Sequence, residues 1–312
     1  MARKKEGKPF VIANPIYDTV FKRLMENQRI AKFFLSTILE QQVEDITVMP
    51  QEFTYRLDET KVLEKAKVVE EKEKEGHVEY FSIFRLDFMA TILDSEGVRR
   101  KILIELQKSW DTLDVIRFRQ YLGEQYVRVD KIDGKEVVLP ITTIYILGNN
   151  LSEIKCPCVK VGRTYTDMLN KKTINTKSKF IENLTHNSYV IQAGRITDVR
   201  YTTNLDKLLS IFEQRYFVKE GSGARKEYPY QPDDEDMTLI TDLLYEMGAD
   251  PKEQKQIEDE EEALRVYNLQ HGTLKKKLEE KEKMIEEKDK RIAELDKRIA
   301  ELERFLRDKQ VE

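Results

Sequence analysis

The sequence predicts an α/β fold, in which a mixed sheet is flanked by helices and is followed by a long C-terminal coiled-coil helix. Two observations predict this fold. Apolar, β-rich segments and amphipathic segments follow one another in the order strand, strand, helix, strand, which is typical of a sheet covered by helices. From about Asp259 the chain changes to a charged heptad pattern, with no Gly after Gly272 and no Pro after Pro251.

The N-terminal part begins with two amphipathic segments. Apolar residues at i, i+3 and i+4 predict helices over Tyr17–Met25 and Arg29–Leu39, and Asp45–Pro50 is typical of a short strand. The charge-dense segment Asp58–Gly76 is interpreted as a solvated loop or as the tip of an extended hairpin. We expect the central part of the sheet after this segment.

Two adjacent strands carry acidic residues where apolar residues are expected. They are Ser82–Leu93 and Lys101–Gln107, joined by a turn at Asp94–Gly97. Asp87 interrupts the first strand and Glu105 interrupts the second. A buried lone carboxylate is costly unless something compensates for it, and a divalent metal ion is a natural compensator. Two carboxylates that converge across such a hairpin are what a Mg²⁺-dependent phosphodiesterase site needs.

Side chains alternate between the two faces of a strand, which predicts the face on which each residue of Ile104–Gln107 lies. Glu105 and Gln107 are expected to point to one face of the sheet, and Ile104 and Leu106 to the other. The alternative interpretation of Glu105 is a half-buried residue of an edge strand, and that of Asp87 is an ion pair with Arg85 or a neighbour.

The remaining elements follow from similar patterns. The amphipathic segment Asp111–Lys131 predicts a helix, and Ile141–Leu147 predicts a third buried strand. Leu205–Phe217 is expected to be helical up to the break at Gly221. Asp233–Met247 is expected to be helical again, with an acidic first turn that suits the helix dipole.

The C-terminal heptads predict a coiled coil. The a positions are Leu278, Ile285, Ile292, Ile299 and Leu306, and the d positions with leucine are Leu274, Leu295 and Leu302. Lys281 and Lys288 occupy the other d positions, so the seam is weaker in its first half. Isoleucine at a with leucine at d favours a parallel homodimer; another oligomer, a partner helix or a single solvated helix are the alternatives.

Composition and charge indicate which kinds of partner the protein could bind. Of 312 residues, 36% are charged, which indicates an elongated solvated part, and the net charge of −4 is unevenly spread. Residues 233–262 contain 13 acidic and 2 basic side chains, whereas residues 1–232 carry a net charge of +5, which gives modest support for a phosphate-backbone partner. Cys156 and Cys158 are expected to be free thiols, since two cysteines do not complete a zinc site.

No segment approaches the roughly 20 apolar residues of a membrane span, and no signal peptide is recognised, so we expect a cytoplasmic protein without a membrane partner. The sequence contains no Walker motif, no Rossmann glycine pattern and no nucleophile elbow. The scattered histidines His77, His186 and His271 have no metal-ligand spacing and are given no catalytic role.

Five segments together resemble a known family, the PD-(D/E)XK nuclease-family transposases, also called recombination-promoting nucleases. The segments, in chain order, are Asn14–Met25, Arg85–Ile92, Ile104–Lys108, Arg117–Tyr126 and Glu182–Gln192. The resemblance extends over about residues 10 to 250. It implies a restriction-endonuclease-like domain over residues 1–232. The acidic composition and the heptads described above set apart a helical connector over 233–258 and a coiled coil over 259–312.

The resemblance also implies an activity. A Mg²⁺-dependent DNA endonuclease, with Mn²⁺ as a second possible cofactor, would hydrolyse phosphodiester bonds of DNA in recombination or mobile-DNA processes. Asp87 and Glu105 would bind the metal together with the backbone carbonyl of Leu106. Related nucleases usually have lysine at the position of Gln107, and here the amide would orient the attacking water.

Two more residues complete the candidate catalytic set. Asp18 is a candidate third acid, with a simple helix-start residue as the alternative. Gln120 either faces the site or lies on a solvated helix face. Lys108 would substitute for the usual lysine only if a bulge turned it to the other face.

The alternative functions are a catalytically weak or inactive nuclease-fold protein that binds nucleic acid, and a scaffold that acts through its coiled coil.

Overall fold

The structure is a computed structural model in which two compact units are distinguished, Met1–Glu258 and Asp259–Glu312. It describes residues 10–49, 88–107, 112–197, 199–219 and 222–266, the backbone of 52–53 and 84–85, and a few helical residues between 269 and 295. The predicted loop over Asp58–Gly76 therefore lies outside the described residues.

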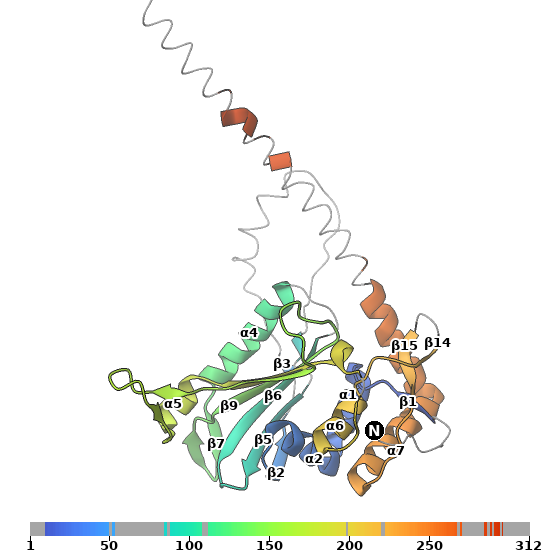
Figure 1. The fold of residues 1–312 in the computed structure, drawn as a ribbon, viewed down its shortest axis with the longest axis horizontal. Helices are drawn as coiled ribbons and strands as arrows, with labels where there is room; N and C mark the ends of the chain where they lie inside the picture. Colours follow the sequence, from blue (N-terminus) through green and yellow to red (C-terminus); the bar gives the residue numbers. More distant parts are fainter. Residues whose placement is uncertain are drawn as a thin grey trace, which may run out of the picture. The chain divides into compact units, whose positions relative to one another are not determined.

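The larger unit contains a six-stranded mixed sheet (Figure 1). In spatial order its strands are β10 (Cys158–Val161), β13 (Asn187–Gln192), β9 (Ile141–Leu147), β6 (Arg99–Gln107), β5 (Phe88–Asp94) and β2 (Val43–Val48). The three central strands β13, β9 and β6 are parallel, and the others pair antiparallel. The predicted mixed sheet flanked by helices is confirmed.

Helices cover both faces of this sheet (Figure 1). On one face lie α1 (Asp18–Glu26), α2 (Gln28–Leu39) and α6 (Asn204–Ser210). There Ile102, Ile104 and Leu106 of β6 belong to the larger hydrophobic core. On the other face lies α4 (Thr112–Val127), which packs on a smaller core around Leu103 and Met89.

A second sheet extends the first unit. It has the order β1 (Phe10–Ala13), β15 (Ser222–Tyr228) and β14 (Phe217–Lys219), all antiparallel. The helix α7 (Glu235–Ala249) lies against β1 and α1. Residues 233–258, set apart by the sequence as a connector, thus contain a helix whose Met237, Ile240 and Leu244 are buried in the larger core.

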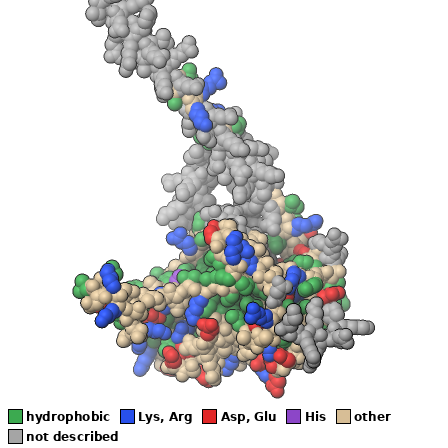
Figure 2. All heavy atoms as spheres, viewed as in Figure 1, with side chains coloured by type: hydrophobic (Ala, Val, Ile, Leu, Met, Phe, Trp, Pro, Cys, Tyr) green, Lys and Arg blue, Asp and Glu red, His purple; other side chains and the backbone are tan. Residues whose placement is uncertain are grey.

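Three antiparallel pairs of short strands are also described in the first unit, and the second and third are hairpins. They are β3 (Glu52–Phe53) with β4 (Phe84–Arg85), β7 (Asp130–Ile132) with β8 (Lys135–Val137), and β11 (Tyr165–Thr166) with β12 (Thr173–Ile174). The helix α5 (Lys179–Leu184) follows the last of them. Acidic and basic side chains are interspersed on the face seen in Figure 2, and hydrophobic and basic side chains gather over the projection at the left.

Two predicted helices are too long. The predicted Asp111–Lys131 helix ends at Val127, because Asp133 and Gly134 both have positive φ (51° and 75°) and form the two-residue turn of the β7–β8 hairpin. The predicted Leu205–Phe217 helix ends at Ser210, and Phe217 begins strand β14. The other predicted helices and strands of this unit are found within a few residues of their expected ends, as far as the structure describes them.

The second unit is described only in part. Residues 259–266 are helical, and the heptad residues Ile285, Ile292 and Leu295 are helical with more than half of each side chain exposed. The other heptad positions, Leu274, Leu278, Ile299, Leu302 and Leu306, lie outside the described residues. The coiled coil therefore stays a prediction. In the part of the chain that the structure describes, no helix has the length and apolar character to cross a membrane.

Lys226 of β15 is completely buried, which gives a testable pH dependence. Its Nζ donates a 2.5 Å hydrogen bond to the backbone oxygen of Glu213, and burial lowers its pKa to about 7. Between pH 7 and the unfolded pKa of about 10.4, the unfolded chain binds more protons at this site, so stability should rise with pH by up to about 1.4 kcal/mol per unit.

The comparison is urea unfolding of the wild type and Lys226→Met at pH 7 and pH 9. The wild type should gain stability over this interval by about 1 to 3 kcal/mol more than the variant. Equal gains in the two proteins would show that Lys226 is charged in the folded state across this range.

Candidate functional site

The candidate site lies at the C-terminal end of β6, beneath α4. Glu105 is 3% exposed, although it carries a carboxyl group, and it is directly paired in register with Tyr145 of β9. Leu103, two residues earlier, contacts the smaller core under α4, so Glu105 shares that face while Ile104 faces the larger core. The predicted alternation of Glu105 and Ile104 between the two faces is therefore found.

Tyr145 forms one wall of the surroundings of Glu105. Its ring lies 4.6 Å from that of Phe118 of α4, measured between centroids. Burial, with a smaller contribution from the charge of Glu105, raises the pKa of Tyr145 to about 12. A neutral phenol next to a buried carboxylate provides a hydrogen-bonding group without adding negative charge.

α4 places a second set of polar groups over the sheet. Tyr121 and Gln125, one helical turn apart, are 2% and 3% exposed and face inward with Phe118. Burial also raises the pKa of Glu124 on this helix. Gln120, a candidate catalytic residue from the sequence, is exposed instead; the glutamine that α4 turns inward is Gln125.

Gln107 and Leu106 lie at the last positions of β6. Gln107 is half-buried, and its backbone oxygen accepts a 2.8 Å hydrogen bond from the N–H of Gly148, just after β9. The side chain of Leu106 is buried in the opposite core, so only its backbone could contribute to a site. The C-terminal ends of the parallel strands β6 and β9 thus meet at one edge of the sheet, a common position for ligand sites in α/β folds.

Asp18 is the first residue of α1, on the face of the sheet opposite to α4. Its carboxylate accepts a 2.5 Å hydrogen bond from Lys22 Nζ one turn later. Buried Asn14 fixes the preceding turn, since its Nδ2 donates to Gln214 Oε1 at 2.9 Å and to the backbone oxygen of Gly223 at 2.8 Å. The buried residues of α1 belong to the larger core, whereas Glu105 shares the face of the smaller core under α4.

Asp87 and Lys108 lie outside the described residues. Among the residues that the structure describes, no group of three or more His, Cys, Asp or Glu side chains has an arrangement that could hold a metal ion. The described donors near the end of β6 are the carboxylate of Glu105 and the amide of Gln107. Both groups have oxygen atoms of the kind that Mg²⁺ prefers as ligands. The predicted metal site also requires the carboxylate of Asp87.

A network around Arg163 joins the segment Glu182–Gln192 to α4. Arg163 donates to Glu182 Oε2 at 2.6 Å, to Asn187 Oδ1 at 3.1 Å and to the backbone oxygen of Thr185 at 2.8 Å. His186 Nδ1 lies 2.6 Å from the hydroxyl of Tyr126 on α4. Burial, and then the charge of Arg163, lower the pKa of His186, which makes it a neutral packing contact at pH 7.

Gln192, the last residue of that segment, has a structural role. Its Oε1 accepts a 2.7 Å hydrogen bond from the N–H of Leu151, and its Nε2 donates to the backbone oxygen of Cys156 at 2.8 Å. It is completely buried and holds the 150–157 connection against the end of β13. Arg163, Tyr145 and Gln125 were not singled out by the sequence, because only the fold brings them to these positions.

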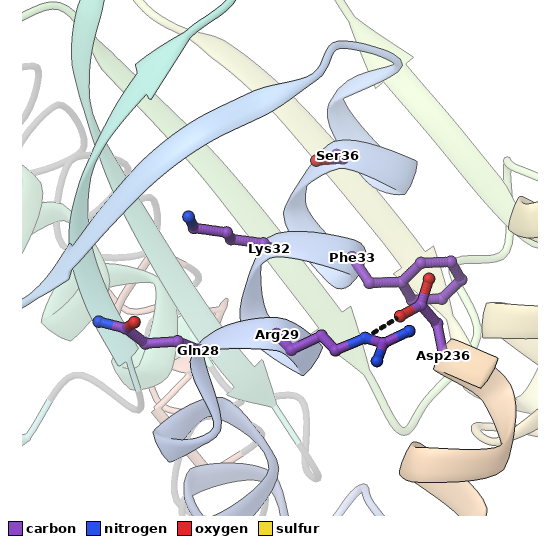
Figure 3. Close-up of a pocket in the computed structure, with 6 residues that line it drawn as sticks. All are labelled: Gln28, Arg29, Lys32, Phe33, Ser36 and Asp236. Carbon is purple, nitrogen blue, oxygen red and sulfur yellow. Dashed lines mark hydrogen bonds and ion pairs between the residues drawn. The ribbon is translucent and has the colours of Figure 1, made fainter.

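A shallow pocket of about 550 Å³ lies elsewhere, between α2 and the start of α7 (Figure 3). Arg29 points across it to Asp236 at 2.7 Å and pairs with Glu235 at 2.9 Å, so its charge is already compensated. Lys32 donates to the backbone oxygen of Glu44 at 2.8 Å. Since α2 lies on the face opposite to α4, this pocket is separate from the surroundings of Glu105.

Comparisons with known proteins add no further constraint on the function. The chain matches no family model, no curated protein and no solved structure.

Proposed function

We propose that this protein is a metal-dependent DNA endonuclease of the PD-(D/E)XK type, in which Glu105 is one of the metal ligands. The observation that carries the proposal is a carboxylate only 3% exposed at the C-terminal end of a central strand, between apolar neighbours and under a helix with inward polar groups. A buried carboxylate needs a compensating group, and a bound metal ion is one such group at a site of this kind.

The register of β5 and β6 supports a pair of carboxylates. Phe88, the first residue of β5, pairs with Ile104 in antiparallel register, and Asp87 directly precedes Phe88 in the sequence as Glu105 directly follows Ile104. The mixed six-stranded sheet with helices on both faces is compatible with the restriction-endonuclease-like class implied by the resemblance.

The residues have separate roles in this proposal. Asp87 and Glu105, with the carbonyl of Leu106, would hold Mg²⁺ or Mn²⁺, which stabilises negative charge on the phosphoryl oxygens when bound. The amide of Gln107 would accept or donate a hydrogen bond to orient the attacking water, without acting as a base. The inward side chains of Tyr121 and Gln125 on α4 and the phenol of Tyr145 on β9 would limit the access of bulk water.

Cleavage of supercoiled plasmid DNA tests the proposal. Purified wild-type protein should nick or linearise the plasmid in Mg²⁺ or Mn²⁺ and not in EDTA, and identically purified Asp87→Ala should be inactive. Equal activity in both proteins would reveal a contaminating nuclease. No cleavage by a folded wild type that binds DNA would favour the non-catalytic nucleic-acid-binding function instead.

Gln107→Lys is a second test, because it restores the residue that related nucleases usually have. A lysine at this position adds a positive charge near the scissile phosphate, and we expect cleavage to accelerate by about tenfold or more. Gln107→Met, of similar length but without hydrogen-bonding groups, should slow the reaction. A Gln107→Lys variant slower than Gln107→Met would mean that the position does not face the phosphate.

The heptads of the second unit support dimerisation. Ile285, Ile292 and Leu295 expose more than half of their side chains in the single chain, and pairing with a second copy would bury them. We expect light scattering to give a dimer for the full chain and a monomer for residues 1–258. A monomeric full chain would contradict the dimer.

A dimer could hold two sites for cuts in opposite strands of a DNA duplex. A role in recombination or mobile DNA belongs to the same proposal, since the resemblance implies it, and a cytoplasmic location would give the enzyme access to DNA.

A further inference from the structure

The β11–β12 hairpin and α5, whose place in the fold is seen in Figure 1, present an unusual mixture of exposed side chains, and Figure 2 shows hydrophobic and basic side chains gathered there. We call this the hairpin surface. Met168 and Leu169 at the tip of the hairpin are 74% and 92% exposed, and Phe180 of α5 is 72% exposed. Exposed lysines surround them: Lys171, Lys172, Lys177 and Lys179. Single exposed apolar residues are common on protein surfaces, but several large ones in one segment indicate a binding surface.

The tip of the hairpin has a defined backbone conformation. Asp167 Oδ1 accepts hydrogen bonds from the N–H groups of Leu169 at 2.8 Å and Asn170 at 3.2 Å, and Lys171 has a positive φ of 56°. Two 2.8 Å backbone bonds close the loop, from Lys171 N–H to the oxygen of Asp167 and from Asp167 N–H to the oxygen of Lys172. The exposed Met168 and Leu169 are therefore held outward by the fold of the loop.

The charge of this surface favours a polyanion. From Arg163 to Leu184 the chain has four lysines, one arginine and two acidic residues, Asp167 and Glu182, and Glu182 is paired with Arg163. The carboxylate of Asp167 is occupied by the loop, since it also accepts a 2.6 Å hydrogen bond from Asn170 Nδ2. No salt bridge is described for any of these four lysines, so their charges are available for phosphates.

The base of the hairpin is fastened to the body that carries the candidate site. Tyr165, the first residue of β11, donates a 2.7 Å hydrogen bond to Glu182 Oε1, whose other oxygen accepts from Arg163. Arg163 also bonds Asn187 of β13, and His186 contacts Tyr126 of α4. The hairpin is thus connected to the helix that covers Glu105.

We propose that the hairpin surface binds duplex DNA, with Met168 and Leu169 inserted as an apolar wedge at a base step in the minor groove and the lysines on the flanking phosphates. This rests on the proposed function, because it gives the same nuclease a way to hold and bend its substrate. Small apolar wedges beside basic residues are how many minor-groove proteins unstack and kink DNA. The polar Thr173 and Asn175 between the lysines, and Asn170 just before them, suit phosphate and sugar contacts better than insertion into lipid.

The test is fluorescence anisotropy of a labelled 30-base-pair duplex with the full-length protein in EDTA, so that binding is measured without cleavage. Lys171→Ser/Lys172→Ser should weaken binding about fivefold or more and reduce the slope of log K against log salt by about 1.8. The matched control is Lys131→Ser/Lys135→Ser, which removes two exposed lysines from the β7–β8 hairpin and should change the affinity less than twofold.

The wedge has its own readout. Wild-type protein should prefer a duplex with a central two-nucleotide bulge, because an unstacked step costs less to open. Met168→Ser/Leu169→Ser should lose this preference and keep the salt dependence. The control Val127→Ser/Val129→Ser, which alters two exposed apolar residues elsewhere, should keep it.

The outcomes separate this inference from the nuclease proposal. Hairpin variants that bind both duplexes as the wild type does would overturn the inference and leave the cleavage result intact. Binding to vesicles with anionic headgroups but not to DNA would also overturn it, in favour of a lipid surface. A third outcome is that the wild type binds DNA without cleaving it and that the hairpin variants lose this binding. This result would support the hairpin surface as a DNA-binding site and contradict the nuclease proposal.

Discussion

Glu105→Gln is expected to lower the rate of plasmid cleavage by about 100- to 1,000-fold, with DNA affinity in EDTA changed less than twofold. The substitution keeps the shape of a side chain that is 3% exposed but removes the charge that would hold the metal ion. The measurement is single-turnover cleavage in Mg²⁺, with Glu136→Gln, an exposed glutamate of β8, as the matched control at wild-type rate.

A thermal readout separates loss of the metal from loss of the fold. Mn²⁺ should raise the melting temperature of the wild type, because a ligand that binds only the folded state stabilises it. Glu105→Gln should melt at least as high as the wild type in EDTA and respond weakly to Mn²⁺. If it cleaves DNA as fast as the control, Glu105 is not a ligand in the reaction.

Asp130→Ala should destabilise the protein by about 3–5 kcal/mol, the second largest effect expected. Asp130 Oδ2 lies 2.9 Å from Nζ of Lys101, which is 1% exposed, so the substitution leaves a buried ammonium without its ion pair. Burial already lowers the pKa of Lys101 against the opposing effect of Asp130, and the variant should lower that pKa further. Part of the lost stability should then return between pH 7 and pH 10, since the unfolded chain binds the extra proton over this range.

Urea unfolding with the double variant Lys101→Met/Asp130→Leu provides the control. Replacing both partners by apolar groups of similar volume removes the uncompensated charge, and the double variant should recover most of the loss. A single variant within about 1 kcal/mol of the wild type would mean that water reaches this pair. The pair lies at the N-terminal end of β6, away from Glu105, so DNA cleavage at low temperature should be unchanged.

The strands around the site could be predicted because local sequence decides them. The alternation of Ile104, Glu105 and Leu106 already predicts that Glu105 faces away from the main core, and the structure shows this. The β7–β8 hairpin was missed although its Asp133-Gly134 dipeptide is a strong hairpin signal. The amphipathic pattern of the preceding helix continued past Val127 and outweighed it.

The surroundings of Glu105 could not be predicted, because they depend on contacts between segments far apart in the chain. Tyr145 lies beside Glu105 only through the parallel register of β6 and β9. Gln125 rather than Gln120 faces inward because of how α4 rotates over Phe118 and Tyr121. Nothing in the sequence distinguishes Arg163 from other basic residues, because its partners Glu182 and Asn187 are brought to it only by the fold.

The most direct test of the central claim is a crystal of the protein soaked in Mn²⁺, examined by anomalous diffraction. The account predicts one strong anomalous peak per chain about 2.0–2.3 Å from a carboxylate oxygen of Glu105, at the end of β6, with Asp87 as a second ligand. The same soak of Glu105→Gln should show no peak there. An ordered Glu105 carboxylate with no Mn²⁺ near it, in a protein that still cleaves DNA, would contradict the proposed site.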